Sequence, residues 1–157
     1  MDVTKYEVLL FAHILFVSIW VGGDAMIQVF WMRAVAAGPE RKVQLMKDVE
    51  WIGQRVLTPS ALLVAAFGVW LVLDSPAWEF SQFFVSFGLA VFVASFVAGA
   101  GFLGPESGRI GRLGDERPVD DPELQTRIER VLLISRIELV LLILVIFSMT
   151  AKPFLGT

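Results

Sequence analysis

The sequence predicts an all-α fold, a transmembrane four-helix bundle, from its composition and from the spacing of its apolar residues. Of the 157 residues, 56% are hydrophobic and only 18% are charged, and the mean hydropathy is +0.70. An average soluble domain has about 25% charged residues. The apolar residues fall into four blocks, and a membrane-spanning helix needs about 20 of them in succession. We therefore expect one integral membrane domain over residues 1–157.

Four spans account for most of the chain. They are expected at about residues 6–35, 56–73, 80–103 and 124–150. Proline near the start of the second and fourth spans, at Pro59 and Pro122, is typical of the first turn of a helix. Gly104 and Pro105 resemble a helix end and are expected to terminate the third span.

The two longer connections differ in pattern. Between the first two spans, over residues 40–55, apolar residues alternate with charges at near-helical spacing. This pattern predicts an interfacial amphipathic helix, either separate from the second span or continuous with it through a kink at Pro59. Residues 106–121 are rich in glycine, proline and charge, which predicts a surface loop.

The basic residues predict the orientation of the bundle. Ten of the thirteen flank the connections between spans one and two and between spans three and four: Arg33, Arg41, Lys42, Lys47, Arg55, Arg109, Arg112, Arg117, Arg127 and Arg130. The connection between spans two and three has Asp74 and Glu79 but no lysine or arginine. The positive-inside rule then places both termini outside the cytoplasm of a multi-pass protein in the bacterial inner (plasma) membrane.

Composition excludes several kinds of site. The absence of cysteine excludes disulfides, thiolate metal sites and iron–sulfur clusters, and the single His13 excludes a multi-histidine cage within one chain. A net charge of -3 gives no reason to invoke nucleic acid. No nucleophile with a neighbouring base and no phosphate-binding loop is evident, so enzyme activity stays an open question. Function must reside in the few polar residues inside the spans.

One face of the first span combines polar and aromatic residues. At about 100° per residue, four side chains fall within roughly 20° of a common direction. They are His13, Trp20, Asp24 and Trp31. We expect this face to point into the bundle. Gly22 and Gly23 flank it, and such small residues let a neighbouring helix or a flat ligand come close.

Asp24 and Glu138 are ionisable groups at membrane depth, where a charge needs a partner or a function. Arg55 and Arg136 lie on the same side of the membrane, so ion pairs of Asp24 with either arginine are feasible. One interpretation is an interhelical charge network of Asp24, Arg55, Arg136 and Glu138 that fixes helix register. The other is a path for protons or cations, in which a desolvated carboxylate exchanges its proton.

His13 also has two interpretations. A lone histidine inside a membrane can hydrogen-bond to a neighbouring helix. It can also be an axial ligand of haem or a related porphyrin, with Trp20, Gly22 and Gly23 lining the cofactor. No second axial ligand is evident in the sequence.

Three segments resemble a known family: FAHILFVSIWVGG in the first span, TPSALL at the start of the second, and RIELVLLILVIFSMTAKPF at the end. They resemble a family of small uncharacterised bacterial four-span membrane proteins. That family is similar to the copper-resistance protein D membrane domain and to the membrane protoporphyrinogen oxidase that binds b-type haem. The resemblance implies that His13 is an axial haem ligand and that the terminal motif maps to Arg136, Glu138, Lys152 and Pro153. The third span lacks the histidine and lysine of the oxidase-type relatives.

Three functions are consistent with these features. The first is binding of b-type haem or another porphyrin through His13. The second is transport of protons or metal ions by Asp24 and Glu138. The third is a non-catalytic accessory role in a membrane complex, with polar residues that are purely structural. The expected partners are the lipid bilayer and either a second copy of the chain or other subunits of a membrane complex.

Overall fold

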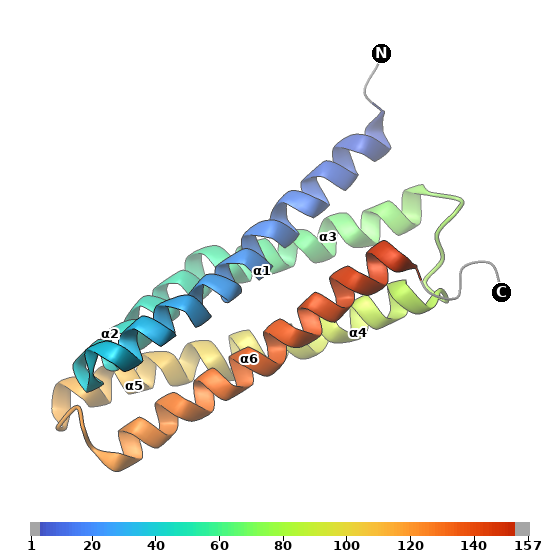
Figure 1. Ribbon diagram of the computed structural model, residues 1–157. Coiled ribbons are helices and arrows are strands. Elements are labelled where there is room, and N and C mark those ends of the chain that lie inside the picture. Colours follow the sequence, from blue (N-terminus) through green and yellow to red (C-terminus); the bar gives the residue numbers. More distant parts are fainter. Residues whose placement is uncertain (1–3, 153–157) are drawn as a thin grey trace.

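The computed structural model describes residues 4–152 and contains only helices and their connections in that part of the chain. The helices are α1 (Lys5–Ala37), α2 (Pro39–Ile52), α3 (Thr58–Asp74), α4 (Phe83–Ala98), α5 (Gly104–Glu116) and α6 (Pro122–Ala151) (Figure 1). Two π-helical turns, Gly53–Leu57 and Gly99–Leu103, join α2 to α3 and α4 to α5. The six helices therefore form four long ones.

The four-helix membrane bundle is confirmed. Each long helix has 30 to 36 residues and is apolar enough to cross a membrane. At about 1.5 Å per residue the helices are about 45 to 54 Å long. A hydrocarbon core is about 30 Å thick, so the ends of the helices extend beyond it. The chain is a small polytopic membrane protein.

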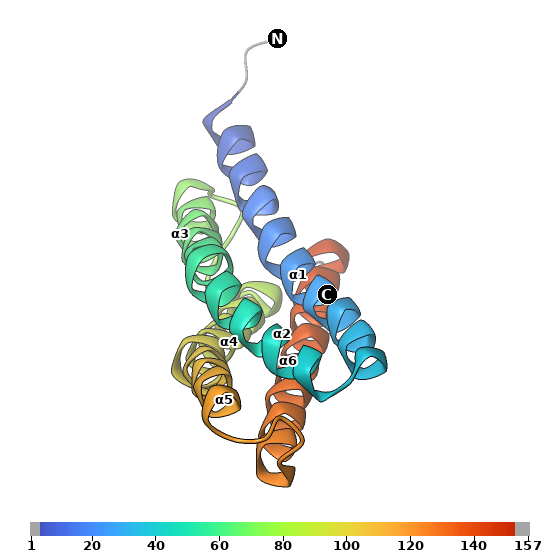
Figure 2. The same cartoon turned by 90° about the vertical axis from the view of Figure 1, so that its left-hand side faces the viewer.

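The bundle is elongated, and both described chain ends lie at the same end of it (Figure 1). At that end α1 lies beside α3 and α6 lies beside α4 (Figures 1 and 2). We call it the apolar end: the first half of α1, α3, α4 and the second half of α6. The opposite, basic end comprises the second half of α1, α2, α5 and the first half of α6. This end contains most of the basic residues.

Each end has its own apolar core. Met46, Ile110 and Ile128 are completely buried at the basic end, where they pack with Trp31 and Ala34. The core of the apolar end comprises Trp20, Ala61, Val64, Val91 and Leu142. Large apolar side chains cover the outside of the spans, as expected of a surface that faces lipid.

The surface loop predicted for residues 106–121 is wrong, because α5 continues as a helix to Glu116. The glycines of this segment face α2. A Cβ atom added at Gly108, Gly111 or Gly114 would clash with side chains of α2, including that of Val43. Glycine here permits close approach of two helices and does not form a turn. Only Arg117 to Asp121 connect α5 to α6.

The helix end predicted at Gly104 and Pro105 is also wrong. The Gly104 N–H bonds to the Gly99 carbonyl in a π-helical turn, and the chain continues directly into α5. Pro105 follows this turn and lies in the interior of the continuous helix that α4, the π-helical turn and α5 form together. Because proline has no N–H and its ring clashes with a preceding carbonyl, a regular α-helix would be disrupted at this point. The wider π-helical turn accommodates it without ending the helix.

The predicted amphipathic helix is present as α2, and it is continuous with α3. The disruption lies at the π-helical turn before Pro59, where the Thr58 N–H bonds to the Gly53 carbonyl. The start predicted near Pro122 is confirmed, since the Asp121 carboxylate caps α6 by accepting hydrogen bonds from the next backbone N–H groups.

Candidate functional site

A cavity of about 280 Å³ lies between the two apolar cores, where all four long helices meet. Both π-helical turns contribute to its wall. Its polar lining residues are Asp24, Gln54, Thr58, Ser95, Ser135 and Glu138. No lysine, arginine or histidine of the described chain lines it. The cavity therefore combines two acidic groups with uncharged polar ones.

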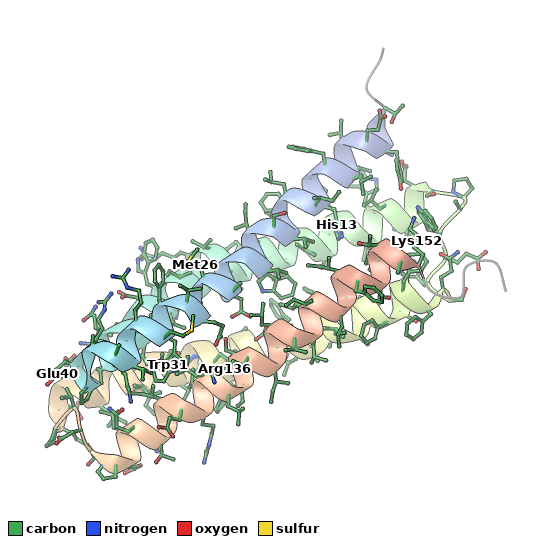
Figure 3. The ribbon with its side chains drawn as sticks, in the orientation of Figure 1. His13, Met26, Trp31, Glu40, Arg136 and Lys152 are labelled. Carbon is green, nitrogen blue, oxygen red and sulfur yellow. The ribbon has the colours of Figure 1, made fainter. Side chains whose placement is uncertain are left out.

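Asp24 on α1 is buried, with 6% of its surface exposed. The Ser135 hydroxyl on α6 donates to Asp24 Oδ1 at 2.9 Å. Ser135 in turn accepts a hydrogen bond from Gln28 Nε2 at 2.8 Å, and Gln28 Oε1 accepts one from Arg136 Nε at 3.2 Å. A chain of donors thus leads from exposed Arg136 (Figure 3) to Asp24, while Asp24 Oδ2 has no hydrogen-bond partner among residues 4–152.

Glu138 lies one turn after Ser135 on the same face of α6, and 9% of its surface is exposed. It lines the same cavity as Asp24. Within residues 4–152 its carboxyl group forms neither a hydrogen bond nor an ion pair. The structure therefore brings together the two acidic residues identified in the sequence.

The two arginines expected to neutralise these carboxylates lie elsewhere. The Arg55 guanidinium lies 5.3 Å above the ring of Trp51, on its own helix. Arg136 reaches Asp24 only through two uncharged side chains. In the described part of the chain, no ion pair includes Asp24 or Glu138.

Sequence reasoning missed Gln28 and Ser135. The spacing of each residue from an acidic residue on its own helix could have identified it. Gln28 follows Asp24 by four residues and Ser135 precedes Glu138 by three, so each shares a helix face with an acidic residue. Because the carboxylates face the interior, polar neighbours on the same faces are the natural hydrogen-bond partners across the α1–α6 contact.

The π-helical turns add backbone acceptors to the same region. The carbonyl of Gln54 needs the N–H of residue 58 in an α-helix or of residue 59 in a π-helix. The Thr58 N–H is bonded to Gly53, and Pro59 has no N–H. The Gln54 carbonyl is therefore left without a donor from its own helix.

The second turn repeats this arrangement. The Gly104 N–H is bonded to Gly99, and Pro105 cannot donate to the carbonyl of Ala100. Both Gln54 and Ala100 line the cavity. The sequence signal is a glycine six residues before a proline within an apolar helix, and it occurs at the corresponding point of two helices. Such π-helical turns are frequent at functional sites.

His13 lies between α1 and α3 (Figure 3), where its Nδ1 is 3.0 Å from the carbonyl oxygen of Val64. Gly68 makes room for the ring, since a Cβ there would lie 3.0 Å from His13 Cε1. A bond from Nδ1 to a carbonyl leaves Nε2 as the nitrogen for a metal. However, His13 lines neither the central cavity nor a second one of about 270 Å³ between α1 and α2. Val64 and Gly68 therefore orient the imidazole.

The other residues expected to line a cofactor, Trp20, Gly22 and Gly23, do not lie around one common site. Trp20 is buried and lines the carboxylate cavity. Gly23 permits contact with the π-helical turn, because a Cβ there would lie 2.7 Å from Leu57 Cδ2. A Cβ at Gly22 would meet nothing within 4 Å. Trp20 and Gly23 therefore belong to the interior of the bundle, whereas Gly22 is exposed.

The family resemblance also includes two residues near the end of the sequence, Lys152 and Pro153. Lys152 does not line the cavity. Lys152 directly follows α6 as its C-cap, and its Nζ lies 4.1 Å from the centre of the Trp78 ring. Pro153 is outside the described residues. Comparison with protein-family models, curated proteins and solved structures found no match to the chain. Functional inference therefore depends on the geometry of the site.

Proposed function

We propose that the protein moves protons or small cations across the membrane and that Asp24 and Glu138 are the site they occupy. The observation that supports this proposal is the pair of carboxylates in one cavity with no cationic side chain in its lining. An uncompensated charge at membrane depth costs several kcal/mol. Bound protons or cations remove that cost, and their exchange is the elementary step of transport.

The purely structural interpretation has less support from the geometry. A charge network that fixes helix register needs opposite charges in contact. Around Asp24 and Glu138, the other polar side chains of the described lining carry hydroxyl, amide and indole groups and no positive charge. A proton or cation is the remaining source of positive charge for the pair.

The test is flux into liposomes containing the purified full chain. A pH-sensitive dye reports protons and a metal-sensitive dye reports divalent cations, each driven by a membrane potential. We expect flux of at least one species with the wild type and its loss in Asp24→Asn and Glu138→Gln. Glu129→Gln is the matched control, because Glu129 is exposed on α6 and does not line the cavity. Equal flux through all four proteins would exclude the proposal.

Porphyrin binding at His13 is a second candidate function, favoured by the hydrogen bond that orients the imidazole. Its test is an absorption spectrum of the detergent-purified protein after addition of haem. A Soret band that is present in the wild type and lost in His13→Ala would support this function. Lack of a shifted band in the wild type would exclude it.

A further inference from the structure

We infer that the central cavity binds a hard divalent cation, such as Mg²⁺ or Mn²⁺, which keeps part of its hydration shell. This inference depends on the proposed function for its site and specifies the species that occupies it. Charge is the first argument. Asp24 and Glu138 together provide two negative charges, and no lining residue in the described part of the chain provides a positive one. One divalent cation neutralises both carboxylates.

Polar atoms without partners provide the second argument. Asp24 is 6% exposed and Ser95 is 3% exposed, and both line the cavity. Asp24 Oδ2 and Ser95 Oγ are buried and lack hydrogen-bond partners within residues 4–152. Buried polar atoms are nearly always paired in native proteins. Two unpaired oxygens beside one cavity indicate that a ligand completes their coordination.

The backbone provides the third argument. Pro59 and Pro105 leave the carbonyls of Gln54 and Ala100 without helical donors, at two residues that line the cavity. Proline inside a helix costs about 3 kcal/mol relative to alanine. Neutral oxygens of this kind are typical ligands of hard cations.

The donor set selects the type of metal. Among the described lining residues, the polar side-chain atoms are oxygens, apart from the Gln54 amide nitrogen and the Trp20 indole nitrogen, and Met46 contributes the one sulfur. Both nitrogens carry protons and are hydrogen-bond donors, so the acceptors are oxygens. Oxygen ligands suit Mg²⁺, Ca²⁺ and Mn²⁺, whereas Zn²⁺ and copper prefer imidazole and thiolate. In the described chain, no three His, Cys, Asp or Glu side chains group as metal ligands. Water must therefore complete the coordination shell, as Mg²⁺ generally requires.

The cavity is large enough to hold a cation together with several water molecules. Its volume is about 280 Å³, and a water molecule in the liquid takes up about 30 Å³. A cation can therefore enter with several of its waters and does not need a close-fitting cage of protein ligands.

The test is Mn²⁺ binding to the detergent-purified full chain, followed by electron paramagnetic resonance. We expect one bound Mn²⁺ per chain that Mg²⁺ displaces. Asp24→Asn and Glu138→Gln should each weaken binding at least about tenfold, the lower end of the loss seen when even an outer metal-site residue is changed. Glu129→Gln should bind as the wild type does. Circular dichroism establishes that each variant is folded.

A second arm addresses the backbone ligands. Pro105→Ala restores an N–H that can bond to the backbone at this turn, and it should weaken Mn²⁺ binding without removing an acidic side chain. Pro122→Ala, in the first turn of α6, is the control. If both carboxylate variants bind Mn²⁺ like the wild type, or if the wild type binds none, the inference is wrong.

The outcomes separate this inference from the proposed function. Proton flux that depends on Asp24 and Glu138, without Mn²⁺ binding, would overturn the inference and leave the proposed function standing. Mn²⁺ binding that depends on both residues, without flux of any ion, would support the inference and reject the transport proposal. The metal would then have a structural role.

Discussion

Asp24 and Glu138 share one cavity but have different surroundings. Asp24 accepts a hydrogen bond at the end of a donor chain that begins at the Arg136 guanidinium. Each donor in that chain points toward Asp24, which favours a negative charge there. Glu138 has no such donor among the described residues. The protein's own donors therefore stabilise the negative charge of Asp24, whereas the charge of Glu138 depends on what binds in the cavity.

Ser135 should be the residue that fixes Asp24 in this arrangement. Ser135→Ala removes the donor to Asp24 Oδ1 and leaves a second buried carboxylate oxygen unpaired. We expect the free energy of unfolding to fall by about 1–3 kcal/mol, the usual cost of a buried polar group without a partner. Chemical unfolding in detergent measures it. In an Asp24→Ala background, the same substitution should cost less, and an equal cost in both backgrounds would contradict this role.

At this scale the sequence predicts which face a residue occupies but not the partner that it contacts. Helical periodicity places Asp24 on the interior face, and the structure agrees. Periodicity does not identify the partner of Asp24, and the expected ion pair with Arg55 or Arg136 is absent from the described residues. Arg55 and Arg136 have long side chains that can reach several groups, and they contact Trp51 and Gln28 instead. Partner choice depends on side-chain rotamers that the period does not specify.

At the scale of the elements, glycine and proline do not mark the boundaries that their usual preferences suggest. In residues 104–116 they lie within a continuous helix. Their role depends on what faces them. The glycines of α5 face α2 across a close contact, and Pro105 follows a π-helical turn. A single sequence does not reveal the neighbouring helix, so local propensity favoured a loop there.

Substitution at two glycines should distinguish close packing from open surface. Gly114→Ala places a Cβ against the buried and β-branched side chain of Val43, and α2 must shift. We expect a loss of about 1–3 kcal/mol in the free energy of unfolding, as in other overpacked cores. Gly22→Ala meets no atom within 4 Å and should be neutral or slightly stabilising. Thermal unfolding in detergent compares the two, and equal effects would contradict the packing of α5 on α2.

Replacement of Pro105 should stabilise the protein, even though we expect the same substitution to weaken Mn²⁺ binding. Pro105→Ala supplies the missing N–H and removes a ring that disfavours the helix interior. We expect the unfolding temperature to rise, because proline costs about 3 kcal/mol in a helix interior. Pro122→Ala should change it little, since proline is well tolerated in the first helical turn. A Pro105→Ala protein of lower stability would mean that the π-helical turn is preferred for reasons other than the proline.

At the scale of the whole molecule, the sequence predicts the architecture better than the site. Four apolar blocks suffice to identify four spans, since a bilayer constrains helix length strongly. The extent of the basic end was not predicted. There α2 and α5 pack like helices of a water-soluble bundle, with an ion pair between Lys47 and Asp115 at 2.7 Å. The cavity forms where this end meets the apolar end, so no single span contains its signature.

The orientation of the whole bundle is directly testable, because the chain contains no cysteine. Ala77 and Asp120 are exposed and lie in the connections at opposite ends of the bundle. If the positive-inside rule holds, Ala77→Cys should react with a membrane-impermeant maleimide added to spheroplasts. Asp120→Cys should react only after the membrane is permeabilised, and the cysteine-free wild type should not react in either case. The reverse pattern would place the basic end outside.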